Sequence, residues 1–311
     1  MLCAPARAGA LAVFAYRFNL TCAACHTVIP HINSFGQAFL KDGFRLPNAP
    51  KRAVFPIAPK VNLAYSSAVD PSGDAWLSYT SKPGLGDASA ALRVTAGEFT
   101  LPLPVDPETQ RDTENHYAVF DQTIGSNPFN FFDDRIGVDV AYGKSTGAGS
   151  DIHLLALEGH DPQSGLPDTG VDRMLTAQTG STTMLISAYR YDGSRRAQSF
   201  DDRFWRQAIG VTTWRGKAEL DALAQSGRDW SPGPGAKPAH SGGGFVQLRW
   251  VFAAPVFAVM RYDETHDSAN GSQQSLTSSL IFRPYRNARL SLEDGVQSNR
   301  HTLNAAWLFA Y

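Results

Sequence analysis

The sequence predicts an all-β fold, a transmembrane outer-membrane β-barrel of about 14 antiparallel strands within a range of about 12 to 16. Two observations support this prediction. From about residue 54 to the last residue, polar and apolar residues alternate in segments of about ten residues, which is the pattern of β-strands with period two. The links between these segments alternate between short and long, as they do when one rim of a barrel carries turns and the other carries loops.

The composition excludes several other classes of protein. The chain has 311 residues and a net charge of −1, so no excess of positive charge draws it to nucleic acid. A hydrophobic content of 43% with 18% charged residues argues against wholesale disorder. No apolar run approaches the roughly 18 residues of a membrane-spanning helix, which excludes a helical membrane protein. We expect outer-membrane lipid, and no nucleic acid, among the partners of the chain.

The chain is predicted to have three parts, namely residues 1–15, 16–50 and 51–311. Residues 1–15 are similar to the end of a signal peptide, because Arg7 is their only charge and Ala15 is a small residue of the kind that signal peptidase prefers. Their apolar stretch is short, so we expect the true start of the signal to lie upstream. The second part is a small α-helical segment and the third is the barrel.

The N-terminal segment carries the most specific motif of the sequence, Cys22-Ala-Ala-Cys25-His26, which is the attachment signature of a c-type haem. The two thiols add to the haem vinyl groups, and the imidazole of His26 becomes the proximal iron ligand. The alternative is a redox Cys-x-x-Cys with an incidental histidine, which would be expected beside a βαβ pattern, and no such pattern follows. We therefore expect one covalent haem c.

A short helix is predicted after this motif. Asn33 or Ser34 can cap its N-terminus, and Gly43 can end it in a left-handed conformation. Phe35 and Phe39 are four residues apart and share one face. That face either covers the haem or packs against neighbouring elements.

The distal iron ligand does not follow from the motif. His31 is the nearest candidate in sequence, and Met174, Met184 and Met260 are candidates if they face the barrel lumen. A single His or Met more often has a structural role than a ligand role.

The barrel strands are predicted from the alternation alone. In residues 136–142, the apolar residues Ile136, Val138, Val140 and Tyr142 share one face. In residues 245–252, the even-numbered residues are all apolar, whereas the odd-numbered ones include Gln247 and Arg249. The predicted strands are residues 59–67, 74–81, 90–100, 133–143, 151–159, 171–178, 182–191, 203–214, 217–226, 244–253, 255–264, 275–283, 287–295 and 301–311, with 117–124 as a further candidate.

The links between the predicted strands sort into two rims. Short links lie at 180–182, 214–217, 253–255 and 283–287, and long polar loops lie at 160–170, 192–202, 227–243 and 265–274. We expect the long loops outside the cell and both termini in the periplasm, which requires an even number of strands. A soluble two-sheet sandwich is the alternative, although its loops need not sort by rim.

Aromatic residues near strand ends predict the interfacial girdles of a membrane barrel. These residues are Tyr189, Tyr191, Trp205, Trp214, Tyr262 and Tyr285, and the chain also ends on an aromatic strand with Tyr311. The alternative for any one of them is an ordinary core aromatic.

Other motif matches fail in their context. Residues 143–147 match Gly-x-Ser-x-Gly, but a nucleophile elbow must open a helix, and the next segment alternates like a strand. His153 and His160 lack a companion ligand at metal spacing. Carboxylates that could attract cations to the outer rim, or else be solvated loop residues, are Asp161, Asp168, Asp172, Asp263, Glu264 and Asp267.

The haem motif with Thr27, Pro30, Phe35-Gly36, Phe39 and Gly43-Phe44, followed by a barrel, resembles the fused monohaem cytochrome c–porin family of the bacterial outer membrane. Only residues 21–47 carry motif-level similarity. The best-known members of the family are outer-membrane iron(II) oxidases, and the resemblance implies that Cys22, Cys25 and His26 attach and ligate the haem. The chain is shorter than is usual in the family, which implies a smaller lumen, and iron oxidation does not follow from the resemblance.

Three functions stand as hypotheses. The first is an electron conduit or iron(II):cytochrome oxidoreductase, which passes electrons from an extracellular donor such as Fe(II) to a periplasmic cytochrome, with the haem on the periplasmic or lumen side. The second is a diffusion porin in which the haem plug is structural or gating. The third is a soluble periplasmic c-type cytochrome with an all-β domain.

Overall fold

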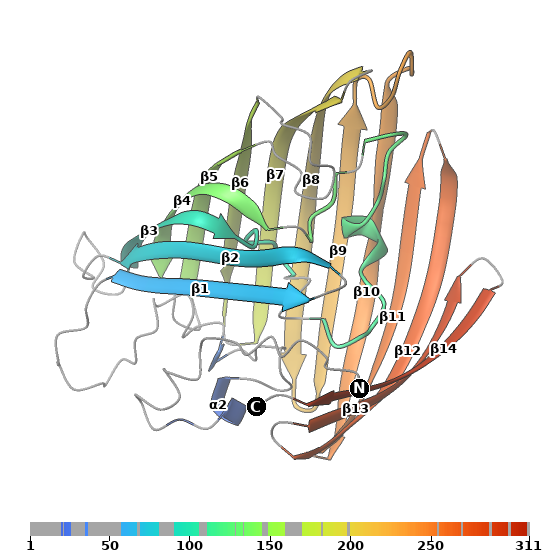
Figure 1. Ribbon diagram of the computed structural model, residues 1–311. Coiled ribbons are helices and arrows are strands. Elements are labelled where there is room, and N and C mark those ends of the chain that lie inside the picture. Colours follow the sequence, from blue (N-terminus) through green and yellow to red (C-terminus); the bar gives the residue numbers. More distant parts are fainter. Residues whose placement is uncertain are drawn as a thin grey trace.

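The fold is one sheet of 14 strands in sequence order, curved into a barrel (Figure 1). The computed structural model describes residues 20, 22–25, 35–36, 57–66, 69–80, 90–105, 111–127, 129–132, 134–144, 149–158, 170–181, 183–197, 200–253, 255–268, 270–285, 288–297 and 300–309. Its strands are β1 (Ile57–Ser66), β2 (Val69–Thr80), β3 (Ala90–Phe99), β4 (Arg135–Lys144), β5 (Gly149–Glu158), β6 (Val171–Gly180), β7 (Met184–Ala197), β8 (Phe200–Arg215), β9 (Ala218–Asp229), β10 (Ala239–Ala253), β11 (Val256–Asp267), β12 (Gly271–Tyr285), β13 (Ala288–Gln297) and β14 (Arg300–Phe309).

The predicted strand number and strand positions are confirmed. Each of the 14 predicted segments overlaps one strand, and neighbouring strands are antiparallel. The further candidate at 117–124 is wrong, because this segment contains the 3-10 helix η1 (Ala118–Phe120) and a single bridge between Ile124 and Asn127. Its apolar side chains, such as Val119, are buried, so the segment has no face toward lipid.

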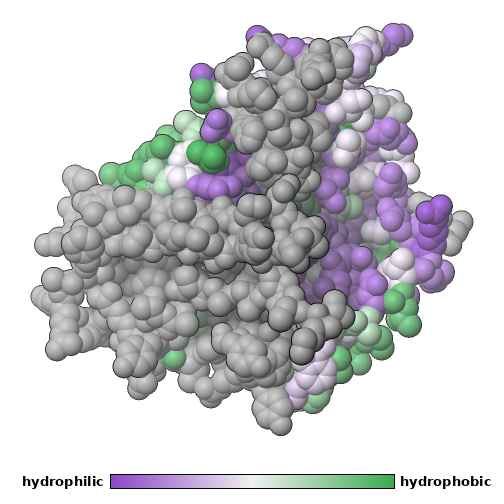
Figure 2. Space-filling model, viewed as in Figure 1, coloured by the Kyte–Doolittle hydropathy of each residue, from purple (hydrophilic) through white to green (hydrophobic). Residues whose placement is uncertain are grey.

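The two faces of the sheet have opposite character. On β10, Leu248 and Trp250 are 40% and 46% exposed, whereas Gln247 and Arg249 are 0% and 2% exposed. Figure 2 shows hydrophilic residues across the inner face of the curved sheet and hydrophobic residues at its margins. Apolar side chains are stable against lipid and charged ones are not, so the outer face is the lipid-facing surface of a membrane barrel.

One rim of the barrel carries short turns between the described strands β6 to β13, as predicted. The turns consist of residues 181–183, 216–217, 254–255 and 286–287. Gly216 in the β8–β9 turn has a φ angle of 61°, a conformation that favours glycine because it has no Cβ. We call this rim the short-turn rim.

The opposite rim, called the long-loop rim, carries the connections at residues 100–134, 159–170 and 230–238. The long loops predicted at 192–202 and 265–274 are wrong, because only residues 198–199 and 268–270 lie between the strands there. β8 has 16 residues, whereas about 9–11 residues suffice to cross a bilayer. Strand residues beyond the bilayer need no apolar face, so they lack the alternation that marks a strand in the sequence.

The predicted aromatic girdle is only partly confirmed. Trp205 and Tyr262 lie on the outer face, as predicted. Tyr189 and Tyr191 are instead 4% and 0% exposed on the inner face, and Trp214 points inward, where its Nε1 donates a hydrogen bond to Glu219 at 2.6 Å. The position of an aromatic residue near a strand end predicts its height in the barrel wall. The register of the strand decides whether that residue faces the lipid or the lumen.

Little of the N-terminal segment is among the described residues. Cys22–Cys25 form α2, a single helical turn, and Phe35 is 41% exposed. The described helices include none that is long and apolar enough to cross a membrane. The predictions for residues 1–15, His26, His31, Phe39 and the side chain of Tyr285 fall outside the described residues.

Candidate functional site in the barrel lumen

The lumen is entered by the connection between β3 and β4, of which the structure describes residues 100–105, 111–127, 129–132 and 134. These described residues are called the inserted segment below. In Figure 1 this segment passes inside the curved sheet, along β9 to β11, and it contacts the inner faces of β7 to β11 and of β13. Several of its apolar side chains are at most 1% exposed, namely Leu101, Val105, Tyr117, Val119, Phe120 and Ile124. The segment is therefore an integral part of the lumen.

Arg261 of β11 binds the first part of the inserted segment. Its Nε donates to Asp263 Oδ2 at 2.7 Å, and its Nη1 donates to Thr113 Oγ1 at 2.6 Å. Its Nη2 donates to the carbonyl oxygens of Asn115 and His116 at 3.0 and 2.7 Å. A guanidinium that is 1% exposed is tolerated because these partners compensate for its loss of water.

Two further charged groups of the wall hold the same part of the segment. Arg249 of β10 lies between Asp112 and Glu219, with its Nε 3.2 Å from Asp112 Oδ2. Glu293 of β13 accepts hydrogen bonds from the backbone N–H of Glu114 and of the next residue, at 2.8 and 2.9 Å. The charges of the wall thus fix the backbone of the inserted segment rather than facing open water.

Tyr117 forms the centre of the attachment to β10 and β11. Its ring lies under the Arg261 guanidinium, 4.5 Å from ring centre to Cζ, and its hydroxyl donates to Gln247 Oε1 at 3.4 Å. Burial raises the pKa of the Tyr117 hydroxyl, so it remains a neutral hydrogen-bond donor. One strand further, Gln225 Nε2 donates to the carbonyl of Val119 at 3.1 Å.

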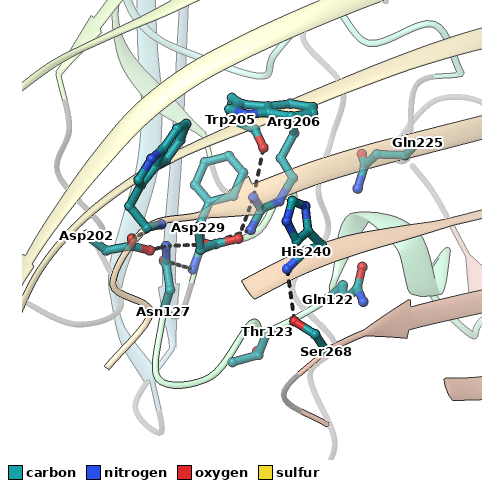
Figure 3. Close-up of polar contacts among 12 residues, drawn as sticks. Gln122, Thr123, Asn127, Asp202, Trp205, Arg206, Gln225, Asp229, His240 and Ser268 are labelled. Carbon is teal, nitrogen blue, oxygen red and sulfur yellow. Dashed lines mark hydrogen bonds and ion pairs between the residues drawn. The ribbon is translucent and has the colours of Figure 1, made fainter. Parts of the chain in front are cut away.

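Asn127 connects the inserted segment to β8 and β9 (Figure 3). Its Nδ2 donates to Asp202 Oδ2 at 2.8 Å and to Asp229 Oδ1 at 3.2 Å. Arg206 Nη1 lies 2.8 Å from Asp229 Oδ2 and supplies a positive charge. One amide therefore bridges two carboxylates that would otherwise repel each other.

The backbone beside Asn127 approaches the connection at 230–238 closely. The N–H of Ser126 donates to the carbonyl of Pro232 at 2.6 Å. A Cβ on Gly125 would lie 2.7 Å from that oxygen, and the φ angle of Gly125 is +60°. Only glycine fits this contact without strain.

The last part of the inserted segment is held by aromatic packing. The ring of Phe129 lies 4.7 Å from those of Tyr191 and Phe204, and the ring of Phe131 lies 5.3 Å from that of Tyr189. All five side chains are buried in one apolar cluster. This aromatic cluster excludes water from the part of the lumen that it fills.

A second polar group lines the inner faces of β3 to β6. His153 Nδ1 lies 2.9 Å from Asp139 Oδ2, and Gln178 Nε2 donates to Asp151 Oδ2 at 3.1 Å. Arg93 lies 3.7 Å from the same Asp151 carboxylate. Within the described part of the chain, no three or more His, Cys, Asp or Glu residues are arranged to hold a metal ion.

The predicted haem residues are only partly described. Cys22 and Cys25 lie at the two ends of the helical turn α2, and residues three apart in a helix share a face. This backbone fits the attachment of two thioethers to one macrocycle. His26 and His31 fall outside the described residues.

Two of the predicted distal ligands face away from the lumen. Met184 and Met260 are 44% and 55% exposed on the outer face, so they do not meet the condition, facing the lumen, on which they were candidates. Met174 is 2% exposed and belongs to the apolar cluster of the lumen. The strand register decides that Met174 faces the lumen and the other two methionines face outward, and this register cannot be read from the sequence.

The predicted cation-attracting carboxylates of the rim also need correction. Asp172 lies 3.3 Å from Arg195, and Asp263 lies 2.7 Å from Arg261, with less than 2% of each carboxylate side chain exposed. Asp267 is 7% exposed. Asp172 and Asp263 thus neutralise arginines inside the barrel, and Asp267 accepts hydrogen bonds from Asn270. Glu264 lies on the outer face, and Asp161 and Asp168 fall outside the described residues.

Sequence reasoning did not identify the inserted segment. A signal was present, because the predicted strands at 90–100 and 133–143 leave a gap far longer than any other between consecutive predicted strands. Long connections in compact domains often carry function, and this one is rich in aromatic residues between 117 and 132.

No protein-family model matches the sequence, and no curated protein matches it. Among solved structures, the anion-selective porin from Comamonas acidovorans is similar with a TM-score of 0.53, over 82% of this chain and 93% of that chain, at 9% identity. The outer-membrane protein OmpT of Vibrio cholerae gives a TM-score of 0.45 over 82% of this chain and 92% of that chain, at 11% identity.

The first of these similarities and the apolar outer face together define the class of fold. It is a porin-like β-barrel with an apolar outer face and a long segment folded into its lumen.

Proposed function

We propose that the protein is an outer-membrane diffusion channel for small hydrophilic solutes, narrowed by the inserted segment. The observation that carries this proposal is the charged inner wall of a porin-like barrel, to which the segment is attached along β7 to β13. An apolar core excludes water and a charged wall attracts it. We therefore place the solute path along the polar wall, which includes Asp139 and His153, and not through the aromatic cluster.

The test is a single-channel measurement in planar lipid bilayers. The wild-type barrel should give discrete, long-lived conductance steps. Replacement of residues 111–131 by a short Gly-Ser linker should give larger steps, because it removes the obstacle from the lumen. The matched control replaces residues 233–237 at the long-loop rim by a similar linker and should conduct like the wild type. Absence of steps from a correctly inserted wild-type barrel would contradict the proposal.

Electron transfer through a bound haem c is the second candidate. The Cys22-x-x-Cys25-His26 motif favours it, and the helical turn of α2 fits attachment. The haem would supply reversible one-electron chemistry at its iron. The two cysteines would hold it and His26 would ligate it, between an extracellular donor such as Fe(II) and a periplasmic cytochrome. A soluble periplasmic protein fits the apolar outer face poorly.

Haem content and cell-surface reduction separate the two candidates. Pyridine haemochrome analysis should give one c-type haem per chain if the second candidate is correct. His26→Ala should then retain the covalent haem but lose electron transfer from an impermeant donor in intact cells. A chain without covalent haem excludes electron transfer, and unchanged transfer in an inserted His26→Ala barrel excludes the proposed path.

A further inference from the structure

Basic residues gather on the outer face of β8 and β9 near the level where the strands leave the bilayer. About 11 residues cross a bilayer in a tilted strand, and that count from the short-turn rim reaches Trp205 on β8 and Arg228 on β9. These two residues are direct partners across the strand pair. Arg203 follows on the same face of β8, two residues further from the short-turn rim. Trp205 therefore marks the boundary between hydrocarbon and headgroups.

Arg203 and Arg228 differ from the arginines of the lumen. Inside the barrel, Arg206, Arg249 and Arg261 each have a carboxylate oxygen within 3.2 Å. On the outer face, within the described residues, neither Arg203 nor Arg228 forms an ion pair, and the buried Nε of Arg228 has no hydrogen-bond partner. Two positive charges at the membrane boundary are thus left without a protein counter-charge.

A neighbouring aromatic ring orients one of these two charges, that of Arg228. The Arg228 guanidinium lies over the ring of Trp230, with Cζ 5.2 Å from the ring centre. Arg190 lies over Trp205 at 4.8 Å but is already paired with Asp192 at 2.7 Å. Stacking limits the freedom of a guanidinium and leaves its N–H groups available at the edge.

We propose that Arg203 and Arg228 bind a phosphate group of an anionic glycolipid in the outer leaflet, with Trp205 against the first carbons of its acyl chains. Guanidinium groups bind phosphate with paired, charge-assisted hydrogen bonds, and the apolar wall below matches the chains of the same molecule. The long-loop rim is extracellular in barrels of this type, which selects the outer leaflet. The proposal rests on membrane insertion and not on channel activity.

The test uses the full chain, purified in a neutral detergent and titrated with bisphosphorylated lipid A in mixed micelles. Native mass spectrometry counts the lipid molecules that remain bound to each barrel. The wild type should retain lipid A and should bind the dephosphorylated lipid roughly 30-fold more weakly, as expected for the loss of contacts to two basic residues worth about 1 kcal/mol each. R203Q/R228Q should lose binding of the phosphorylated lipid to a similar degree.

The matched control is R215Q/K217Q, which removes two positive charges at the short-turn end of the same strand pair and should bind like the wild type. R203K/R228K keeps the charge and should retain most of the binding. Equal binding of phosphorylated and dephosphorylated lipid by the wild type overturns the proposal, as does equal loss in R203Q/R228Q and R215Q/K217Q. Channel conductance should be unchanged in R203Q/R228Q, so a failure here leaves the proposed channel standing.

Discussion

The tripeptide Arg-Tyr-Asp occurs twice in the chain, as residues 190–192 on β7 and residues 261–263 on β11. In both copies the arginine and the aspartate form an ion pair at 2.7 Å. On β11 this pair faces the lumen and each side chain is 1% exposed. On β7 the pair faces outward, and the side chains are 44% and 52% exposed.

The tyrosines of the two copies also point to opposite faces of the sheet. Tyr191 is buried in the lumen against Phe129, and its hydroxyl donates to Asp172 at 2.6 Å. Tyr262 lies on the outer face, where it is 41% exposed. Identical residues thus serve as a structural anchor or as a surface group depending only on which face of the strand points inward. The energetic consequences should differ accordingly, and the changes at Arg261, at the two tyrosines and at Arg190 test this.

The largest effect is expected for Arg261→Met. This change leaves the Asp263 carboxylate buried without its cation and releases Thr113 and the carbonyl groups of the inserted segment. Breaking one side of a buried ion pair costs about 3–5 kcal/mol. Urea unfolding of the barrel in lipid vesicles should show this loss in the free energy of unfolding. Arg261→Lys should recover only part of it, because lysine lacks the planar fork.

The next effect is expected for Asn127→Asp. It places a third carboxylate beside Asp202 and Asp229 and should lower the free energy of unfolding by about 2–3 kcal/mol at pH 8. The loss relative to the wild type should shrink as the pH falls, because protons bound by the crowded folded state relieve the repulsion. Asn127→Ala is the control, and its loss should depend little on pH. An equal pH dependence in both variants contradicts the prediction.

A smaller difference is expected between the two tyrosines. Tyr191→Phe removes a buried hydroxyl that donates to a carboxylate and should cost about 1–2 kcal/mol. Tyr262→Phe removes an exposed hydroxyl 3.3 Å from Glu264 and should change the free energy of unfolding by less than about 0.5 kcal/mol. The same unfolding titrations measure both, and a larger cost for Tyr262→Phe would reverse the assignment of faces.

The smallest effect is expected for Arg190→Met. The ion pair that it breaks has the same length as the one at Arg261, but it lies on the outer face beside Trp205, at the bilayer boundary that headgroups and water reach. Screening by this water should limit the loss to about 1 kcal/mol or less. Comparison of Arg190→Met with Arg261→Met therefore isolates the contribution of burial. Similar losses in the two variants would show that burial does not set the strength of these pairs.

Much of the barrel could be predicted from the sequence because period two is a local property. The alternation in residues 136–142 and 245–252 identified strands and grouped the residues that share a face. It failed where the strand continues beyond the bilayer, as at 192–202, because both faces are then polar. It also failed at 117–124, where the apolar residues Tyr117, Val119 and Phe120 are buried inside the barrel without forming a strand.

The candidate site was much less accessible to sequence reasoning. Its contacts join residues far apart in the chain, such as Glu114 and Glu293, which are 179 positions apart, and Tyr117 and Gln247, which are 130 apart. No local pattern marks such pairs. The haem motif at Cys22-x-x-Cys25-His26 is local, so the sequence predicts it directly, and it remains a prediction that the haem measurement will test.

The sequence by itself determined the fold class, the number of strands and their approximate positions, because alternation and breaks in alternation are written along the chain. Only the tertiary structure decided which face of each strand points inward and that the inserted segment enters the lumen. Period two divides a strand into two faces without saying which of them is the inner one. That choice is made by the register between neighbouring strands and by the curvature of the sheet around a shared interior. The choice of inner face therefore places Arg261 in the lumen and Arg190 on the outer face, although both belong to the same tripeptide sequence.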